Sequence, residues 1–489
     1  MIGASLIAAA LLTSAASNAA TTTRTADCLS VPKGFSSLAV KAAAAPASLW
    51  KGWIYGDDIK MTVAPHDALF DQPVAVRVHG LKPGQPLTLK ASATDRQGRT
   101  WSASAIFVAD THGEIDAGRM APQYGDYSGV HAMGLVWAMK PEGVKNPAYA
   151  LFIPKDHHIE FAALARGKLL AQATLTRSHV APNVRHIQVN TDGLVGDLFL
   201  PTTPGKHPGI VVLGGSEGGL HPQVEEAALL AAHGYAALGL AYFQGGMGIR
   251  TKNPRLAGLP KMLVEIPLEY FVKAADWLKQ QPGVDAHEVA IMGWSKGAEA
   301  ALVTAALFPR DFQAVLAYAP SSVAWFGLQY RGPATSSWTL DGNPLPWATP
   351  IVDPALFTGG KPISFTPGYA AGLEDTAAVS KAAIPVERIA GPVLLISGTD
   401  DQMWPSAVMA RQIMQRLAAH DHAYADESLC YRGAGHMILP PYRPTVTTGV
   451  TAGPMTILLG GSQIAYAFAN PDSWHKVLRF LQTALQETP

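Results

Sequence analysis

A serine lies at the centre of the pentapeptide 293–297, between an apolar strand-like segment (287–292) and a helical pattern that begins at Ala298. Glycines two positions before and after the serine permit a tight turn, because a side chain there would collide with the neighbouring strand or helix. Such a turn lifts the hydroxyl of Ser295 above the edge of a sheet. The amide of Lys296, at a helix N-terminus, points toward the same space. The pattern predicts a nucleophilic Ser295 and an oxyanion-binding amide at Lys296; the alternative is a glycine-rich turn with an inert serine.

A serine nucleophile needs a general base and a carboxylate that orients the base. In the α/β-hydrolase fold these residues follow the serine in the order acid, then histidine. The predicted strand 391–398 is followed by Asp401, and a carboxylate just beyond the carboxyl end of a strand faces the site of a doubly wound sheet. The predicted last strand, 428–432, leads into a glycine-rich loop that carries His436. We therefore predict a triad of Ser295, Asp401 and His436.

Two neighbouring aspartates compete for the acid position. Asp401 lies three residues after Gly398, the offset expected in this fold, whereas Asp400 lies two residues after it. We expect Asp401 to be the acid, and we expect Asp400 to cap the helix that follows Pro405.

A second oxyanion donor is expected in the loop 214–219, which follows the apolar strand 209–213. Glycines in this loop let backbone amides approach a ligand closely, so the amide of Ser216 or Glu217 is expected to contribute. The carboxylate of Glu217 is an alternative acid, although we expect it to point outward. A nucleotide-binding loop is disfavoured, because the phosphate-loop and dinucleotide glycine spacings are both absent from this segment.

Composition restricts the possible classes of protein. The 489 residues exceed the usual size of one hydrophobic core, and the chain is 48% apolar and 15% charged, as in well-buried globular proteins. Lys plus Arg equals Asp plus Glu, 37 each, which argues against a nucleic-acid or polyanion partner. The spacings typical of metal sites do not occur, so neither a metal nor another cofactor is expected. Cys28 and Cys430 are able to pair, but a free Cys430 in a core strand is favoured.

The first 20 residues resemble a secretory signal peptide. An apolar run at 6–12 is followed by small residues up to Ala20, near which cleavage is expected. The run is too short for a stable membrane span. We therefore expect export to the periplasm or the outside of the cell, followed by a tail or linker over 21–60. If the signal is misread, the location is cytoplasmic.

The rest of the chain divides into two patterns. Residues 61–180 carry short alternating strands separated by turns, which predict an immunoglobulin-like β-sandwich. Residues 183–489 alternate strand and helix, which predicts a doubly wound α/β catalytic domain. Within it, 321–383 is rich in Pro, Gly and Trp with weak periodicity, and we interpret it as a lid or substrate-wall insertion.

Nine short segments, spread over both predicted domains, match those of a known family in the same order: 68–74, 80–85, 101–105, 133–137, 239–243, 266–271, 293–297, 398–406 and 433–436. On these segments the chain resembles the acyl-CoA thioesterases and bile-acid-CoA:amino-acid N-acyltransferases, over roughly residues 63–481. The resemblance implies the same triad, with hydrolysis in members with a serine nucleophile and transfer to an amine in members with a cysteine. With Ser295, it implies a serine acyl hydrolase acting on a small-molecule acyl thioester (acyl-CoA-like) or ester. An acyltransferase to an amino acid is the alternative, a non-catalytic binding protein is disfavoured, and the oligomeric state is not indicated.

Overall fold

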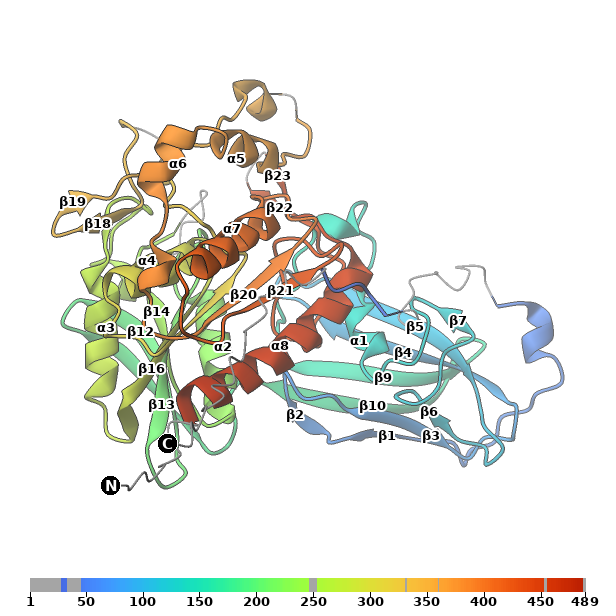
Figure 1. Cartoon of the computed structure of the whole chain (residues 1–489). Helices are drawn as coiled ribbons and strands as arrows, with labels where there is room; N and C mark the ends of the chain where they lie inside the picture. Colours follow the sequence, from blue (N-terminus) through green and yellow to red (C-terminus); the bar gives the residue numbers. More distant parts are fainter. Residues whose placement is uncertain are drawn as a thin grey trace, which may run out of the picture.

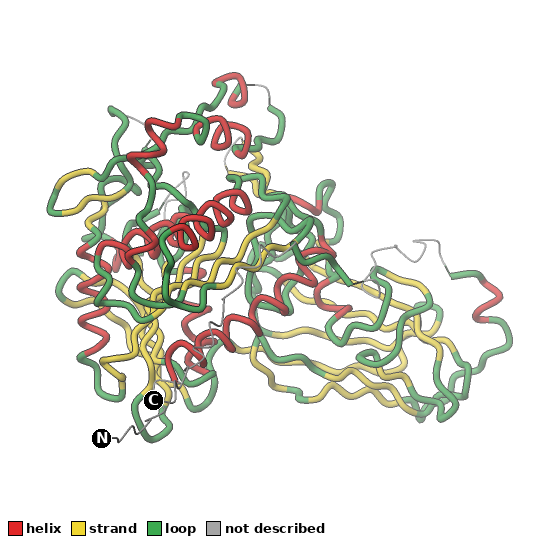
Figure 2. The backbone as a smooth tube through the Cα atoms, viewed as in Figure 1, coloured by secondary structure: helices red, strands yellow, loops and turns green. Residues whose placement is uncertain are grey.

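The computed structural model describes residues 28–32, 45–245, 253–329, 332–358, 360–452 and 455–486, so the expected signal peptide (1–20) lies outside the described residues. Strands gather in two separate groups, one on each side of the molecule (Figure 2). Among the described residues, no helix has both the length and the apolar character needed to cross a bilayer.

The N-terminal group of strands forms two facing sheets that enclose one core. Alternate side chains of β4 (Pro86–Thr94) and β5 (Thr100–Val108) are buried, which is the period expected for strands with one face on a core. These side chains pack against those of β3 (Ala75–His79), which belongs to the other sheet. The remaining strands of the two sheets are β1 (Lys60–Ala64), β2 (Asp67–Leu69), β6 (Ile115–Asp116), β7 (Tyr124–Gly125), β8 (Lys140–Pro141), β9 (His158–Ala165) and β10 (Lys168–Ser178). The predicted sandwich architecture is therefore present.

The second group of strands forms one eight-stranded sheet in the order β11-β12-β14-β13-β16-β17-β20-β21. The five pairings from β14 to β21 are parallel, and the two that involve β12 are antiparallel. The strands of this sheet are β11 (Val184–Thr191), β12 (Leu194–Pro201), β13 (His207–Leu213), β14 (Ala236–Ala241), β16 (Val284–Trp294), β17 (Ala314–Tyr318), β20 (Val393–Gly398) and β21 (Glu427–Tyr431). Several are buried throughout, because helices cover both faces.

The helices divide between the two faces of this sheet. Buried side chains of α3 (Glu269–Lys279), α4 (Lys296–Leu307) and α7 (Ser406–Ala419) share one apolar core. Those of α2 (His221–Ala232) and α8 (Gln463–Gln486) share the core on the opposite face. Figure 1 shows α8 passing beside the sandwich as well. The α/β class predicted from the sequence is confirmed.

The insertion at 321–383 contains more regular structure than its weak periodicity indicates. Its β18 (Trp338–Leu340) pairs with β15 (Ile266–Pro267) and with β19 (Asn343–Pro344) to form a small sheet. The helices η5 (Pro354–Phe357), α5 (Thr366–Gly372) and α6 (Thr376–Ala382) follow, and they lie at the top of Figure 1. The remaining described elements are α1 (Gly134–Trp137), η2 (Ala47–Trp50), η3 (Pro147–Tyr149), η4 (Pro254–Leu256), η6 (Val386–Arg388), β22 (Gly449–Ala452) and β23 (Met455–Leu458).

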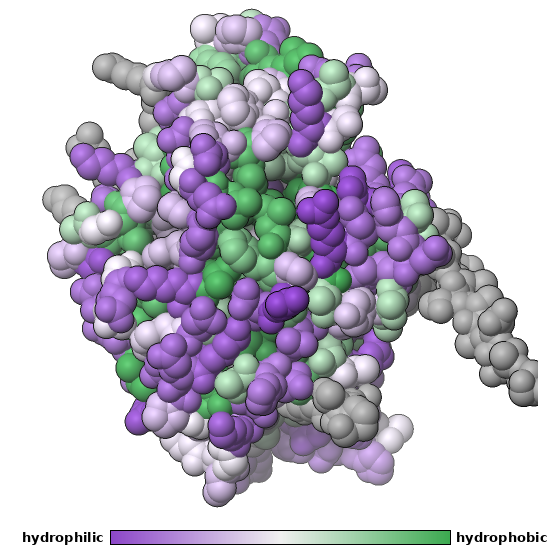
Figure 3. All heavy atoms as spheres, turned by 60° about the vertical axis from the view of Figure 1, so that its left-hand side comes forward, coloured by the Kyte–Doolittle hydropathy of each residue, from purple (hydrophilic) through white to green (hydrophobic). Residues whose placement is uncertain are grey.

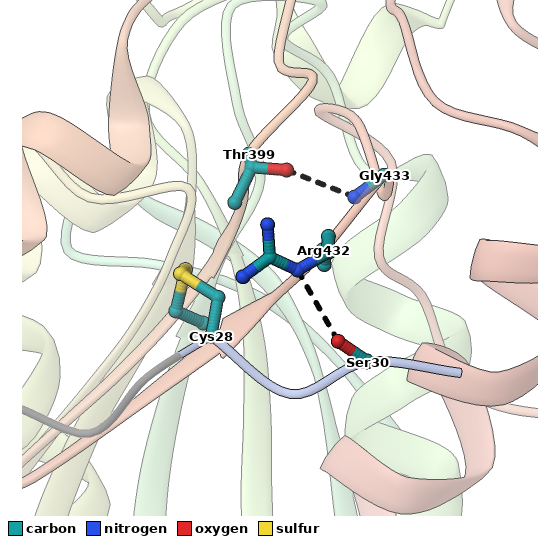
Figure 4. Close-up of a disulfide and its surroundings, with 6 residues drawn as sticks. Cys28, Ser30, Thr399, Arg432 and Gly433 are labelled. Carbon is teal, nitrogen blue, oxygen red and sulfur yellow. Dashed lines mark hydrogen bonds between the residues drawn. A yellow bond between two sulfur atoms is a disulfide. The ribbon is translucent and has the colours of Figure 1, made fainter. Parts of the chain in front are cut away.

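A short N-terminal segment covers the open edge of the large sheet beside β21. Leu29 forms a parallel bridge with Tyr431, and its N–H donates to the carbonyl of Cys430 at 2.7 Å. A disulfide joins Cys28 to Cys430, so the expectation of a free Cys430 is wrong (Figure 4). Spacing alone did not reveal the pair, because 402 residues separate the two cysteines and only the pairing of the segment with β21 brings them together.

Candidate active site

Ser295 occupies a strained turn between β16 and α4. Its φ of 54° and ψ of −117° lie outside the regions that side-chain-bearing residues usually adopt. The N–H of Ser295 donates to the carbonyl of Tyr318 at 2.9 Å, which ties the turn to the adjacent strand. This strand–turn–helix geometry presents a serine hydroxyl at the carboxyl edge of a parallel sheet.

The two glycines of the pentapeptide are required by close backbone contacts. A Cβ at Gly293 would lie 2.2 Å from the carbonyl oxygen of Gly297. A Cβ at Gly297 would lie 2.2 Å from the carbonyl oxygen of Gly214, in the loop after β13. The turn therefore packs directly on the loop expected to hold the second oxyanion donor.

Asp401 and His436 come together after β20 and β21. The Nδ1–H of His436 donates to the carboxylate of Asp401, with distances of 2.9 and 3.0 Å to its two oxygens. Both side chains are buried. The carboxylate of Asp401 also accepts from the N–H of Met403 at 2.9 Å and from the hydroxyl of Ser406 at 2.6 Å. A carboxylate fixed in this way holds the imidazole in one tautomer, with Nε2 free to act as a base.

Asp400 bonds to partners other than His436, and it does not cap the following helix as expected. Its two oxygens accept from the side-chain amide of Gln402 at 2.8 Å and from the N–H of Gly461 at 2.9 Å. The N-cap residue of α7 is Pro405, which receives no side-chain cap. The expectation is wrong because the carboxylate of Asp400 accepts a hydrogen bond from Gly461, in the segment before α8, and this distant contact is not visible in the local sequence.

The loop 214–219 contributes to the site in two ways. Ser216 lines the same cavity as Ser295 and Lys296. The carboxylate of Glu217 turns inward and accepts from the N–H of Gly215 at 2.8 Å, so the expected outward orientation is wrong. A Cβ at position 215 would lie 2.8 Å from Oε2 of Glu217 and 3.2 Å from Cβ of Ser295, so the carboxylate lies near Ser295. Burial raises the pKa of Glu217 above its ordinary value.

A cavity of about 310 Å³ opens at Ser295. Its lining is mostly apolar and comes mainly from the insertion: Ser216, Ser295, Lys296, Phe326, Leu328, Thr349, Pro350, Val352, Phe357, Phe365, Tyr369, Met403 and Trp404. The ring of Trp404 lies against that of His436, with 6.0 Å between their centres, which connects the imidazole to this cavity. Figure 3 shows apolar side chains gathered in the middle of one face, below the uppermost part of the molecule. Small-molecule sites commonly have this volume and lining.

The sequence did not identify several of these residues. The aromatic side chains of the insertion come from a segment without periodicity, so nothing marked Phe326 or Tyr369 as wall residues. Ser406 lies in one of the segments that carry the family resemblance, but its bond to Asp401, five residues earlier, is not marked by any sequence pattern. In the described part of the chain, no group of His, Cys, Asp and Glu side chains has the arrangement of a metal site.

Models of known protein families match both parts of the chain. Residues 266–487 match the family model described as the C-terminal region of BAAT and acyl-CoA thioester hydrolases, and 71–191 match the corresponding N-terminal region. Residues 194–331 also match the dienelactone hydrolase family. A dienelactone hydrolase-like phosphotriesterase, P91 from metagenomic libraries, aligns with 62% of this chain and 98% of its own at 19% identity, with a TM-score of 0.37.

Two curated relatives span most of the chain. Acyl-coenzyme A thioesterase 1 of Rattus norvegicus is 31% identical over 427 residues, which cover 85% of this chain and 94% of the relative. Acyl-coenzyme A amino acid N-acyltransferase 1 of Mus musculus is 30% identical over 443 residues, which cover 88% and 99%. These matches cover most of the chain, which belongs to the family of acyl-CoA thioesterases and bile-acid-CoA:amino-acid N-acyltransferases, as an enzyme of the hydrolase type.

Proposed function

We propose that this protein hydrolyses an acyl thioester or ester through Ser295, Asp401 and His436, with an acyl-enzyme intermediate. The hydrogen bond from His436 to Asp401 is the observation that carries the proposal, because it leaves Nε2 of His436 available as a base. The ring of Trp404, which packs against this imidazole, lines the same cavity as Ser295. The family relatives support an acyl thioester as one substrate class.

In the first half-reaction, Oγ of Ser295 attacks the acyl carbonyl while Nε2 of His436 takes the hydroxyl proton. The negative charge on the carbonyl oxygen is stabilised by the amide of Lys296 and by an amide of the loop 214–219, either that of Ser216 or that of Glu217. Collapse of the tetrahedral intermediate breaks the bond to the leaving thiol or alcohol, which receives the proton from His436.

In the second half-reaction, water attacks the ester on Ser295, again with His436 as the base. The same oxyanion donors stabilise the second tetrahedral intermediate, and its collapse releases the carboxylic acid and restores the serine hydroxyl. The apolar side chains of the insertion favour an acyl group with a hydrocarbon chain, since the cavity offers few polar partners.

A panel of acyl-CoAs and p-nitrophenyl esters tests the proposal on purified protein. We expect the protein to hydrolyse at least one of these two classes of substrate. We expect Ser295→Ala to abolish this hydrolysis while the fold remains intact. Hydrolysis at the wild-type rate by Ser295→Ala would contradict the mechanism.

Transfer of the acyl group to an amino acid is the second candidate, because one group of relatives consists of N-acyltransferases. An oxyester on serine is less susceptible to amines, relative to water, than a thioester on cysteine, so hydrolysis is favoured here. Product analysis with added glycine separates the two: amide as the main product would favour transfer.

We also propose that the protein is exported. The apolar run at 6–12 and the small residues after it support a signal peptide, and the disulfide of Cys28 with Cys430 fits an oxidising compartment. Protein isolated from its native host should begin near Ala20 or Thr21. An intact Met1 on a cytoplasmic protein would contradict export.

A further inference from the structure

Two ionisable side chains are buried in the first turn of α4, and the proposed reaction uses neither of them. The side chains of Lys296 and Glu299 are 3% and 0% exposed. Nζ of Lys296 lies 2.8 Å from each carboxylate oxygen of Glu299. Removing two charges from water is costly, and apolar side chains of similar size often give equal or greater stability. Stability alone is therefore a weak reason for this pair.

Glu299 also bonds to the insertion. Its Oε1 accepts from the indole Nε1 of Trp338 at 2.7 Å and from the backbone N–H of Trp325 at 2.9 Å. Nζ of Lys296 lies 5.3 Å from the centre of the Trp338 ring, which is a cation–π contact. Both tryptophans are fully buried. The pair thus joins the residue after the nucleophile to two points of the insertion.

One of the two anchored points, Trp325, lies next to residues of the cavity wall. Phe326 and Leu328, which line the cavity, follow Trp325 closely in the chain. The ring of Tyr369, another lining residue, packs edge-on against that of Trp325 with 4.7 Å between centres. Any displacement of Trp325 would therefore move the surface that contacts an acyl chain.

We propose that the Lys296–Glu299 pair positions the oxyanion amide and the wall of the acyl cavity relative to each other, so that seating of the acyl chain affects turnover as well as binding. This inference rests on the proposed function, since it assigns the oxyanion to the amide of Lys296. Lys296 and Glu299 are positioning residues through their side chains, because these act through the backbone of the turn and through the tryptophans.

The double variant Lys296→Met/Glu299→Gln tests this role. It removes both charges together, and the side-chain oxygen of Gln still accepts from Trp325 and Trp338, so no uncompensated charge is left in the core. We expect kcat for an octanoyl ester to fall by roughly tenfold or more, because small misplacements of catalytic groups have effects of this size. We also expect the ratio of octanoyl to acetyl kcat to fall, because the wall no longer moves with the turn.

A milder variant covers the case in which the double variant fails to fold. Trp338→Phe removes the indole donor together with one ring, and it keeps a single aromatic ring beside Lys296. We expect the octanoyl-to-acetyl ratio to fall by roughly threefold, the effect of one lost hydrogen bond, with a smaller change in acetyl kcat. An unchanged ratio in Trp338→Phe would overturn the proposal, as would a folded double variant with wild-type kcat and ratio.

A matched control separates positioning from general loosening. Arg416 in α7 pairs with Glu387 in η6, with 2.8 Å between Nη2 and Oε1, and neither residue lines the cavity. Arg416→Met/Glu387→Gln should change Tm and leave the ratio unchanged; the same loss of ratio in this control would overturn the proposal.

Labelling of Ser295 by fluorophosphonates with short and long alkyl chains supplies a readout that needs no substrate. If the wild type labels but hydrolyses neither esters nor thioesters, the proposed function fails. In that case the positioning role of Lys296 and Glu299 is still tested, by comparing how strongly the variants and the wild type prefer long-chain over short-chain fluorophosphonates. Absence of labelling in the wild type would overturn both proposals.

Discussion

Replacing Asp401 by Asn should nearly abolish turnover and leave the fold in place. The Oδ1 of Asn still accepts from the backbone N–H groups of Met403 and Trp404, which bond to Asp401 at 2.9 and 3.3 Å. The amide NH₂ replaces Oδ2 and donates to Nδ1 of His436, where the carboxylate accepted. The imidazole is then held in the tautomer whose Nε2 carries the proton, and it cannot take the proton of Ser295.

The size of the effect follows from losing the base while keeping the geometry. Such a change of tautomer lowers kcat by about 10⁴-fold, equivalent to about 5 kcal/mol of transition-state stabilisation. Asp400→Asn is the matched control, because its partners are Gln402 and Gly461 and not the imidazole. It should cost about 1 kcal/mol of stability through one weakened hydrogen bond and change kcat little.

The assay is the steady-state hydrolysis of the best substrate from the ester and acyl-CoA panel, with Tm measured for both variants. A larger loss of kcat in Asp400→Asn than in Asp401→Asn would refute the assignment of the acid.

Three further predictions address the nucleophile, the N-terminal segment and an ion pair. Ser295→Cys should raise the ratio of amide to free acid at fixed glycine, because a thioester intermediate reacts more readily with amines; an unchanged ratio would mean that access of the amine decides the outcome. Cys28→Ser/Cys430→Ser should lower the free energy of unfolding by about 2–4 kcal/mol, which chemical denaturation with and without reductant will measure, and equal midpoints would contradict it. The Arg416 guanidinium lowers the pKa of Glu387 from 4.5 to about 2, so the pair stabilises the fold above about pH 4.5 and loses this contribution as the pH falls toward 2. Glu387→Gln should therefore cost about 1 kcal/mol at pH 7, after allowance for screening, and almost nothing at pH 2; an equal cost at both pH values would contradict the linkage.

Local patterns in the sequence predicted the elements that carry the residues of the proposed triad. These elements are the apolar strand before Ser295, the helix after it, and the strands before Asp401 and His436. Each is indicated by short-range periodicity and by the placement of glycines within a single segment of the sequence. The choice of Asp401 over Asp400 came from its offset after the strand, and its contact with His436 agrees with that choice.

Features that depend on contacts between distant segments were not predictable. The sequence predicted that the insertion is a lid or substrate wall, but it did not show which of its side chains line the cavity or that Trp338 bonds to Glu299 of α4. The inward orientation of the Glu217 carboxylate depends on a hydrogen bond from the N–H of Gly215, a residue that lies close to Ser295 in the fold. The pairing of Cys28 depends on a segment that adds to the edge of the sheet.

Isolation of the acyl-enzyme tests the central claim most directly. The protein is mixed with an excess of the best p-nitrophenyl ester, quenched in acid within the first turnover, and digested for mass spectrometry. We predict one acyl group on the peptide that contains Ser295 and none in Ser295→Ala. An unmodified Ser295 peptide during active turnover, or an acyl group on a different residue, would contradict the account.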